Sequence, residues 1–101
     1  MARGRMINTS ITRDEEFNEM SIDAQFLFMR TVPFLDRDGL ITGNTALLWS
    51  DVAPLLSHYA AKMDVIINEW CENGFCIKYK DGKKDVLFFP SFHLKWAVCV
   101  P

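Results

Sequence analysis

The sequence predicts an α+β fold in which three helices surround one core and a C-terminal β-hairpin projects from them. Apolar residues recur three or four positions apart, as on one face of a helix, at Met63, Ile66, Ile67 and Trp70. Asn73-Gly74 then supplies the left-handed backbone that ends helices. From Phe75 to Lys80 apolar and polar residues alternate, which is typical of a strand. With 101 residues, 50% of them apolar, the chain is the size of one domain with ample core.

The first helix is predicted to begin after Ser21, a good N-cap, with Asp23 near the positive end of the helix dipole. Its apolar residues follow at helical spacing: Ile22, Phe26, Leu27, Met29 and Phe34. Pro33 lies within this pattern and should kink or loosen the last turn, because proline lacks a backbone donor. The segment DRDG, residues 36–39, stops the helix. Leu40 to Thr42 are then short enough for an isolated strand.

Two further helices are expected before the hairpin. One is predicted from about Thr45, with Asn44 as its cap, and runs through Leu47, Leu48 and Val52 toward Leu56. Pro54 interferes with its end. The next is predicted from about Tyr59 to Asn73 and carries the apolar stripe that ends at Trp70.

The hairpin is predicted from the alternation after Gly74, the turn sequence DGKK and a return strand of Val86 to Phe89, ended by Pro90. The whole order is therefore helix, short strand, helix, helix and hairpin. This is the order of a winged helix-turn-helix, in which the hairpin is the wing. Other small α+β folds share it.

The chain is divided on this interpretation into an N-terminal arm of residues 1–20, a winged-helix domain of residues 21–93 and an apolar tail of residues 94–101. Within the arm, INTSIT (residues 7–12) alternates enough for a brief strand. The first 13 residues contain three arginines and no acid, whereas residues 14–23 contain five acids and no base. We expect the acidic run Asp14 to Glu19 to be solvated, because it lacks the oxygen spacing and turn glycine of a cation loop.

No metal site, cofactor or enzyme activity is predicted. The cysteines, Cys71, Cys76 and Cys99, have no close pairing, and with His58 and His93 they lack zinc-ligand spacing. Cys71 and Cys76 are interpreted as small buried hydrophobes. The sequence has no phosphate-binding glycine loop, H-E-x-x-H or G-x-S-x-G motif, so neither catalysis nor a small-molecule substrate is expected.

The odd number of cysteines and the lack of an apolar signal segment predict a protein of the reducing cytoplasm. No apolar run approaches the roughly 20 residues that cross a bilayer, so a membrane is not expected as a partner.

Residues 23–44, DAQFLFMRTVPFLDRDGLITGN, resemble the N-terminal winged-helix domain of phage replisome organisers, which are DnaD-like phage replication initiators. The matching positions are Ala24, Leu27, Phe28, Pro33, Asp36 and Gly39. The opening RGRMIN, the segment MDVIINEWCENGFCIKYKDGKK and the later FFPSFH are also similar to the family, so the resemblance covers about residues 3–93. The segment TALLWSDVAPLLSHYAAK matches only loosely, and LKWAVCVP is apolar where relatives continue into a polar linker and a second domain.

The resemblance implies a DNA-binding module of a phage or prophage replication initiator, acting in the cytoplasm of the bacterial host. Its partner would be double-stranded origin DNA. The resemblance also implies self-assembly and contacts with replisome proteins, so a protein-interaction or oligomerisation module is the alternative. A winged-helix transcriptional regulator is a further alternative that differs only in the DNA it meets.

Cations on the predicted wing and arm are the candidate DNA contacts. The wing carries Lys78, Lys80, Lys83 and Lys84, of which the last two are expected at the turn. Lysines on a protruding hairpin can meet phosphates, although they also serve as solubility devices on exposed strands. Arg3 and Arg5 lie on an arm that is predicted to be flexible and able to enter a minor groove, unless it is simply a disordered basic terminus.

The third helix is predicted to contact DNA only through its start. Its exposed side carries Asp64, Glu69 and Glu72, which would repel phosphates. Usable donors remain near its N-terminal end, at His58, Tyr59 and Lys62. The hairpin is therefore the stronger candidate for the interface than the helix before it.

Overall fold

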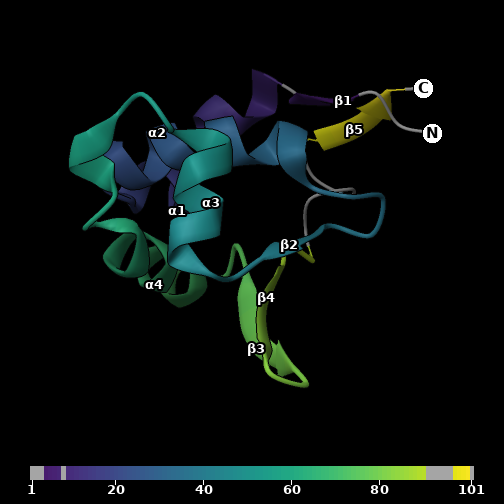
Figure 1. Ribbon diagram of the computed structural model, residues 1–101. Coiled ribbons are helices and arrows are strands. Elements are labelled where there is room, and N and C mark those ends of the chain that lie inside the picture. Colours follow the sequence, from purple (N-terminus) through teal and green to yellow (C-terminus); the bar gives the residue numbers. More distant parts are fainter. Residues whose placement is uncertain (1–3, 8, 91–96, 101) are drawn as a thin grey trace.

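The computed structural model describes residues 4–7, 9–90 and 97–100, with side chains described for residues 11–90. Within them the chain forms an α+β fold whose helices are α1 (Glu15–Glu19), α2 (Ile22–Thr31), α3 (Thr45–Val52) and α4 (Met63–Glu72). Short 3-10 helices are η1 (Thr9–Arg13), η2 (Val32–Phe34) and η3 (Ser57–Tyr59). The helices gather on one side, and a hairpin extends away from them (Figure 1).

The strands form two antiparallel sheets. The larger has the order β2–β4–β3, from β2 (Leu40–Thr42), β3 (Ile77–Asp81) and β4 (Lys84–Phe88). The smaller pairs β1 (Gly4–Ile7) with β5 (Ala97–Val100), which places these two distant segments side by side (Figure 1). The predicted order of helix, strand, helix, helix and hairpin is present as α2, β2, α3, α4 and β3–β4.

Helix α2 begins as predicted, and its cap is tied to α4. The Ser21 hydroxyl accepts a hydrogen bond from the Ala24 N–H at 3.2 Å and donates one to Glu69 Oε1 at 2.9 Å. The other carboxylate oxygen of Glu69 accepts from the Ser21 N–H. Glu69 therefore fixes the first turn of α2 through charge-assisted hydrogen bonds. The predicted cap of α3 is also confirmed, because Asn44 Oδ1 accepts from the Leu47 N–H at 3.1 Å.

The buried face of α2 differs from the prediction. Of the five residues predicted along it, only Leu27 is buried, and the exposed ones are Ile22, Phe26, Met29 and Phe34. The helix instead buries Ala24, Leu27, Phe28 and Thr31. Apolar residues of α2 lie on several sides of the helix, so their spacing does not show which side is buried. Packing against α3 and α4 determines the buried side. As predicted, the α-helix gives way at Pro33, which lies in η2.

Trp70 is the centre of the core. Its side chain is 0% exposed, and its indole N–H donates to the Ala24 carbonyl oxygen at 2.9 Å. The ring lies edge-on to Phe28 at 6.0 Å and to Phe89 at 5.9 Å between centroids. Such edge-to-face pairs add to the free energy gained by burying the rings. The predicted stripe of α4 is confirmed, since Met63, Ile66 and Ile67 are buried beside it.

The N-terminal segment is part of the core rather than a separate arm. Ile11, Phe17 and Met20 are buried, and Phe17 packs edge-on against Phe28 at 5.9 Å. The boundary predicted at residue 20 therefore does not separate the core from an arm. The strand predicted at residues 7–12 is also wrong, because η1 occupies Thr9–Arg13 and the strand is β1. Residues 97–100 of the predicted tail form β5, whose Val100 pairs with Gly4.

The third predicted helix starts later than expected. Helix α4 begins at Met63, and Ser57–Tyr59 form η3 ahead of it. The end is as predicted: Gly74 has φ +81°, its N–H donates to the Cys71 carbonyl, and the Phe75 N–H donates to the Trp70 carbonyl. These two bonds form a Schellman motif.

Strand β2 was predicted to be isolated, but it pairs with β4 of the hairpin. Leu40 pairs with Phe88 and Thr42 with Val86. Beyond the strand, the Gly43 N–H donates to the Asp85 carbonyl at 2.8 Å. A Cβ at Gly43 would lie 2.9 Å from the Asp85 carbonyl carbon, so this close approach requires glycine.

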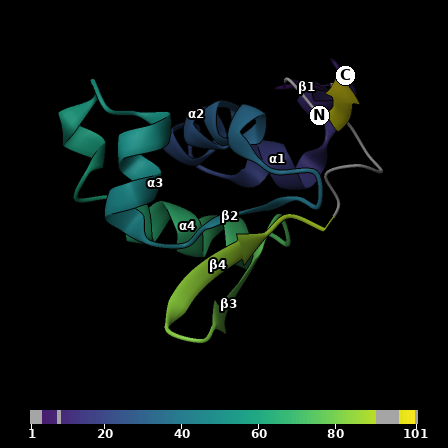
Figure 2. The same cartoon turned by 45° about the vertical axis from the view of Figure 1, so that its right-hand side comes forward.

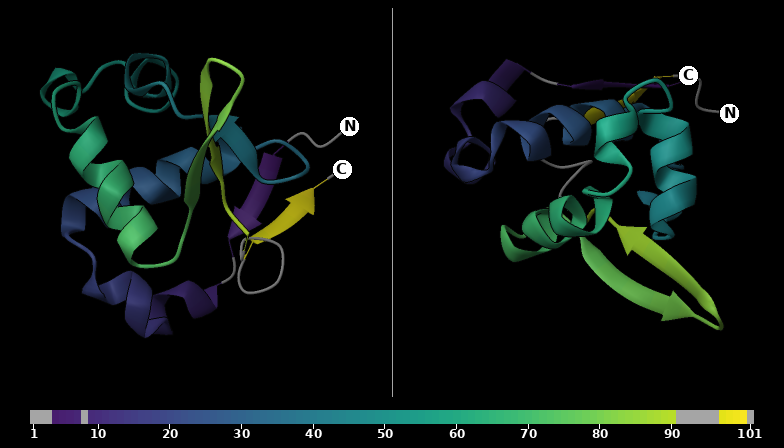
Figure 3. Two further views of the ribbon diagram at one scale, coloured as in Figure 1. Left: turned by 90° about the horizontal axis from the view of Figure 1, so that it is seen from below. Right: turned by 60° about the vertical axis from the view of Figure 1, so that its left-hand side comes forward.

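The hairpin β3–β4 is confirmed, although its return strand already begins at Lys84. Gly82 and Lys83 form its two-residue loop, and Gly82 has φ +65°. A positive φ at the first loop residue alone is typical of a type II′ turn, which favours glycine there. Beyond its contact with β2 the hairpin projects from the helical layer, as the rotated views show (Figures 2 and 3).

We predict that Glu69→Ala lowers the free energy of unfolding by about 1–2 kcal/mol, because it removes both acceptors from the cap of α2. The matched control is Glu72→Ala in the same helix. Glu72 is exposed, so its removal should change stability by less than about 0.5 kcal/mol. Urea unfolding followed by tryptophan fluorescence measures both values, and equal effects would contradict the capping role of Glu69.

Candidate nucleic-acid interface

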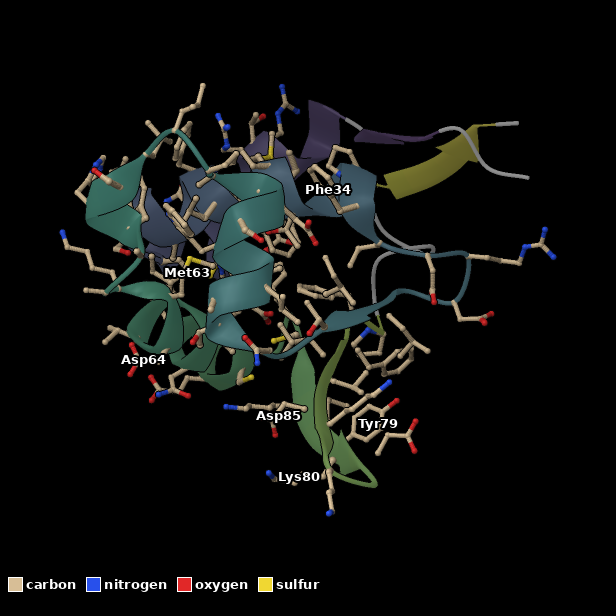
Figure 4. All side chains as sticks on the ribbon, in the orientation of Figure 1. Phe34, Met63, Asp64, Tyr79, Lys80 and Asp85 are labelled. Atoms are coloured by element: carbon tan, nitrogen blue, oxygen red, sulfur yellow. The ribbon has the colours of Figure 1, made fainter. Side chains whose placement is uncertain are left out.

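The hairpin presents four exposed lysines: Lys78, Lys80, Lys83 and Lys84. Lys83 lies in the loop as predicted, whereas Lys84 is the first residue of β4 and pairs with Asp81. Lys80 Nζ lies 3.4 Å from Asp85 Oδ1, so one of the four cations has a carboxylate partner. This ion pair is exposed and contributes little to stability. Figure 4 shows Lys80 extending from the tip of the hairpin.

The two faces of the hairpin differ in chemistry. Strand register places Lys78 opposite Leu87 and Lys80 opposite Asp85, so these residues share a face. The other face carries Ile77, 53% exposed, and Tyr79, 41% exposed, and the register also places the pair of Asp81 and Lys84 on it. Figure 4 shows Tyr79 and Asp85 on opposite sides of the hairpin. The alternation of apolar and polar residues in FCIKYK is consistent with this separation of Ile77 and Tyr79 from Lys78 and Lys80.

A groove of about 540 Å³ runs between the hairpin and the start of α3. Lys83, Lys84 and Asn44 contribute to its lining, so two cations lie near the positive end of a helix dipole. Asp36 and Asp85 also line it. Both carboxylates are engaged, since Asp36 Oδ1 accepts from the Leu40 N–H at 2.9 Å and Asp85 pairs with Lys80.

The exposed face of α4 is acidic and partly apolar. It carries Asp64, Asn68 and Glu72, together with Val65, which is 64% exposed. Asp64 points away from the core, whereas Met63 points between the helices (Figure 4). Glu69, predicted to repel phosphates, is instead used in the cap of α2.

The predicted donors at the start of α4 have different positions. Lys62 directly precedes the helix and is exposed. His58 is exposed in η3, with its ring centroid 4.2 Å from that of Tyr59. Tyr59 is buried, and its hydroxyl donates to Asp23 Oδ1 at 2.7 Å, so this predicted donor is already used within the protein. The hydrogen bond to Asp23, with burial, raises the pKa of Tyr59 above its ordinary value.

The two predicted arm arginines are only partly described. Arg3 lies outside the described residues. Arg5 is in β1, where its backbone pairs with Cys99, so the expectation of a flexible arm at this position is wrong. The side chain of Arg5 lies outside the described part of the structure.

The cysteines are closer than the sequence indicated. Cys71 Sγ and Cys76 Sγ are 3.2 Å apart, although no close pairing was predicted. Cys76 is buried, as predicted, and Cys71 is partly buried. His93 and the side chain of Cys99 lie outside the described residues. Among residues that the structure does describe, no three His, Cys, Asp or Glu side chains gather to hold a metal ion.

Comparisons of the chain with protein-family models, curated proteins and solved structures find no match. None of the helices in the described ranges has the length and apolar character needed to cross a membrane.

We predict that Tyr59→Phe lowers the free energy of unfolding at neutral pH. The variant should also lose less of that free energy than the parent chain as the pH rises into the alkaline range. Because the folded-state pKa of Tyr59 is raised, its hydrogen bond stabilises the fold below the unfolded-state pKa of about 10. This contribution is lost as the pH rises through the folded-state value. Urea midpoints across the alkaline range, with the exposed Tyr79→Phe as control, measure the difference. Parallel curves for Tyr59→Phe and the parent chain would contradict the assigned bond.

Proposed function

We propose that the chain is a winged-helix domain that binds double-stranded DNA through its hairpin. The observation that carries the proposal is the group of four exposed lysines on a hairpin that extends beyond the helices. In the context implied by the resemblance, this domain serves a phage or prophage replication initiator in origin binding and replisome assembly.

The arrangement of the elements supports the winged-helix assignment. Helices α2, α3 and α4 pack on one another, and β2 between the first two is hydrogen-bonded to β4 of the hairpin. This strand pairing gives the hairpin a fixed root on the helical core. A fixed root lets its tip reach a phosphate backbone without a large loss of conformational entropy.

The charges favour the hairpin over α4 as the principal contact. Residues 77–88 contain four lysines against Asp81 and Asp85, whereas the exposed face of α4 carries Asp64 and Glu72. A phosphate backbone binds where cations exceed acids, because binding releases condensed counterions. The principal phosphate contacts are assigned to Lys83 and Lys84, which line the groove beside α3. His58 and Lys62 are assigned as secondary contacts.

A second function, that of a protein-interaction module, is favoured by exposed apolar side chains. Ile22, Phe26 and Met29 are 77%, 40% and 39% exposed on one side of α2, and Ile77 and Tyr79 are exposed on the hairpin. Exposed apolar groups that cluster mark sites of protein association. A salt series separates the two functions, because electrostatic DNA binding collapses as salt rises and apolar association does not.

We predict that replacing Lys83 and Lys84 together with Gln weakens binding to a labelled DNA duplex. The slope of log K against log salt should fall in magnitude by about 1.8, since each lost phosphate contact removes about 0.9. Fluorescence anisotropy titrations over a salt series measure both quantities. In the same assay, Lys62→Gln should weaken binding if the start of α4 contributes, and unchanged affinity would remove Lys62 from the interface.

The control for the double variant is Arg13→Glu, which changes the net charge by the same amount. Arg13 is exposed in η1, on the far side of the helices from the hairpin (Figure 1). An equal loss of affinity in both variants would show a net-charge effect and contradict a hairpin interface. No binding even at low salt, together with a dimer by light scattering, would support the interaction module instead.

A further inference from the structure

Two thiols meet at the joint between α4 and the hairpin. Cys71 lies in the last turn of α4, and Cys76 directly precedes β3. Their sulfur atoms are 3.2 Å apart, so an approach of about 1 Å would reach the length of a disulfide bond. Cys76 is 3% exposed, whereas Cys71 retains partial access to solvent.

Backbone structure holds the two cysteines in register. The Schellman motif at Asn73-Gly74 reverses the chain, with hydrogen bonds from the Gly74 N–H to the Cys71 carbonyl and from the Phe75 N–H to the Trp70 carbonyl. Phe75 is buried against Phe28 at 5.3 Å between ring centroids. The segment from Cys71 to Cys76 is therefore anchored to the core at both ends, and the sulfur contact is part of that packing.

We propose that Cys71 and Cys76 form a site of thiol–disulfide exchange, at which a low-molecular-weight disulfide such as oxidised glutathione converts them to an intramolecular disulfide. The site is independent of DNA binding. It would covalently join the end of α4 to the root of the hairpin.

The reaction divides into two exchange steps. The Cys71 thiolate attacks one sulfur of oxidised glutathione, forms a mixed disulfide and releases one glutathione thiolate, which takes up the proton that Cys71 lost. Cys76 then loses its proton to solvent, and its thiolate attacks the Cys71 sulfur and displaces the second glutathione, which is protonated. Two protein thiols are oxidised by two electrons in total, and one glutathione disulfide is reduced to two thiols.

Accessibility assigns the order of these steps. Cys71 is the more exposed thiol and reacts with the external disulfide, while Cys76 resolves the adduct from the protein interior. Burial raises the pKa of the Cys76 thiol, so only a small fraction is thiolate at neutral pH. The resolving step should accelerate about tenfold for each pH unit, since the thiolate is the attacking species.

The test uses the full chain incubated with oxidised glutathione, acid-quenched, alkylated at its free thiols and digested with trypsin. Cleavage after Lys62 and Lys78 places both cysteines in one peptide and separates them from Cys99. We expect this peptide to lose the mass of two hydrogens and to carry no alkyl group or glutathione. Reduction with dithiothreitol before alkylation should restore two alkylated cysteines.

Two single variants identify the roles. Cys76→Ser should accumulate a stable glutathione adduct at Cys71, whereas Cys71→Ser should leave Cys76 unmodified in the folded protein. Three results with the unaltered chain would overturn the proposal: both thiols remain alkylatable, the adduct persists unresolved as the pH is raised, or the disulfide joins two chains. None of these results depends on whether the chain binds DNA.

Discussion

The packing of Trp70 determines how the rest of the fold is arranged. Its indole N–H bonds to the Ala24 carbonyl, so α4 lies close against α2 at a point where the small alanine side chain permits contact. Its ring also packs against Phe28 and Phe89, which join α2 and the end of the hairpin in one aromatic cluster. Because Trp70 is also the acceptor of the Phe75 N–H, the same residue fixes the turn from α4 into the hairpin. The direction in which the hairpin leaves the core follows from this packing.

Local signals in the sequence were sufficient for the starts of α2 and α3 and for the end of α4, but not for α1, which was not predicted. Ser21, Asn44 and Gly74 act through hydrogen bonds or backbone angles within a few residues, so their roles can be predicted from neighbours in the chain. The start of α4 was less clear, because nothing in the run from Ser57 to Lys62 distinguishes a 3-10 turn from an α-helix.

Features that depend on contacts between distant residues could not be predicted. The buried face of α2 is chosen by Ala24 and Trp70, which are 46 residues apart. Glu69 was predicted to be a repulsive charge on the exposed side of the third helix, whereas it accepts hydrogen bonds from Ser21, the N-cap of α2. Likewise, the sequence presented Tyr59 as a possible donor to DNA, but in the structure its hydroxyl donates to Asp23, which is 36 residues away in the chain. Of the predicted interface, the four lysines retained exposed positions because a hairpin tip has few neighbours to alter them.

The hairpin combines a rigid root with a basic tip. Gly43 and β2 bind the return strand, and the thiols of Cys71 and Cys76 lie beside the entry strand, so both ends of the hairpin are anchored. The ion pair of Lys80 with Asp85 leaves Lys78, Lys83 and Lys84 as the cations that form no ion pair within the described residues. These positions form the core of the proposed DNA interface.

The most direct test of this account is a titration of the ¹⁵N-labelled chain with a DNA duplex at low salt, followed by amide chemical shifts. Binding through the hairpin predicts the largest changes at residues 80–85 and near Asn44, with small changes at Asn68 and Glu72. Changes centred on the exposed face of α4, or no changes at all, would contradict it.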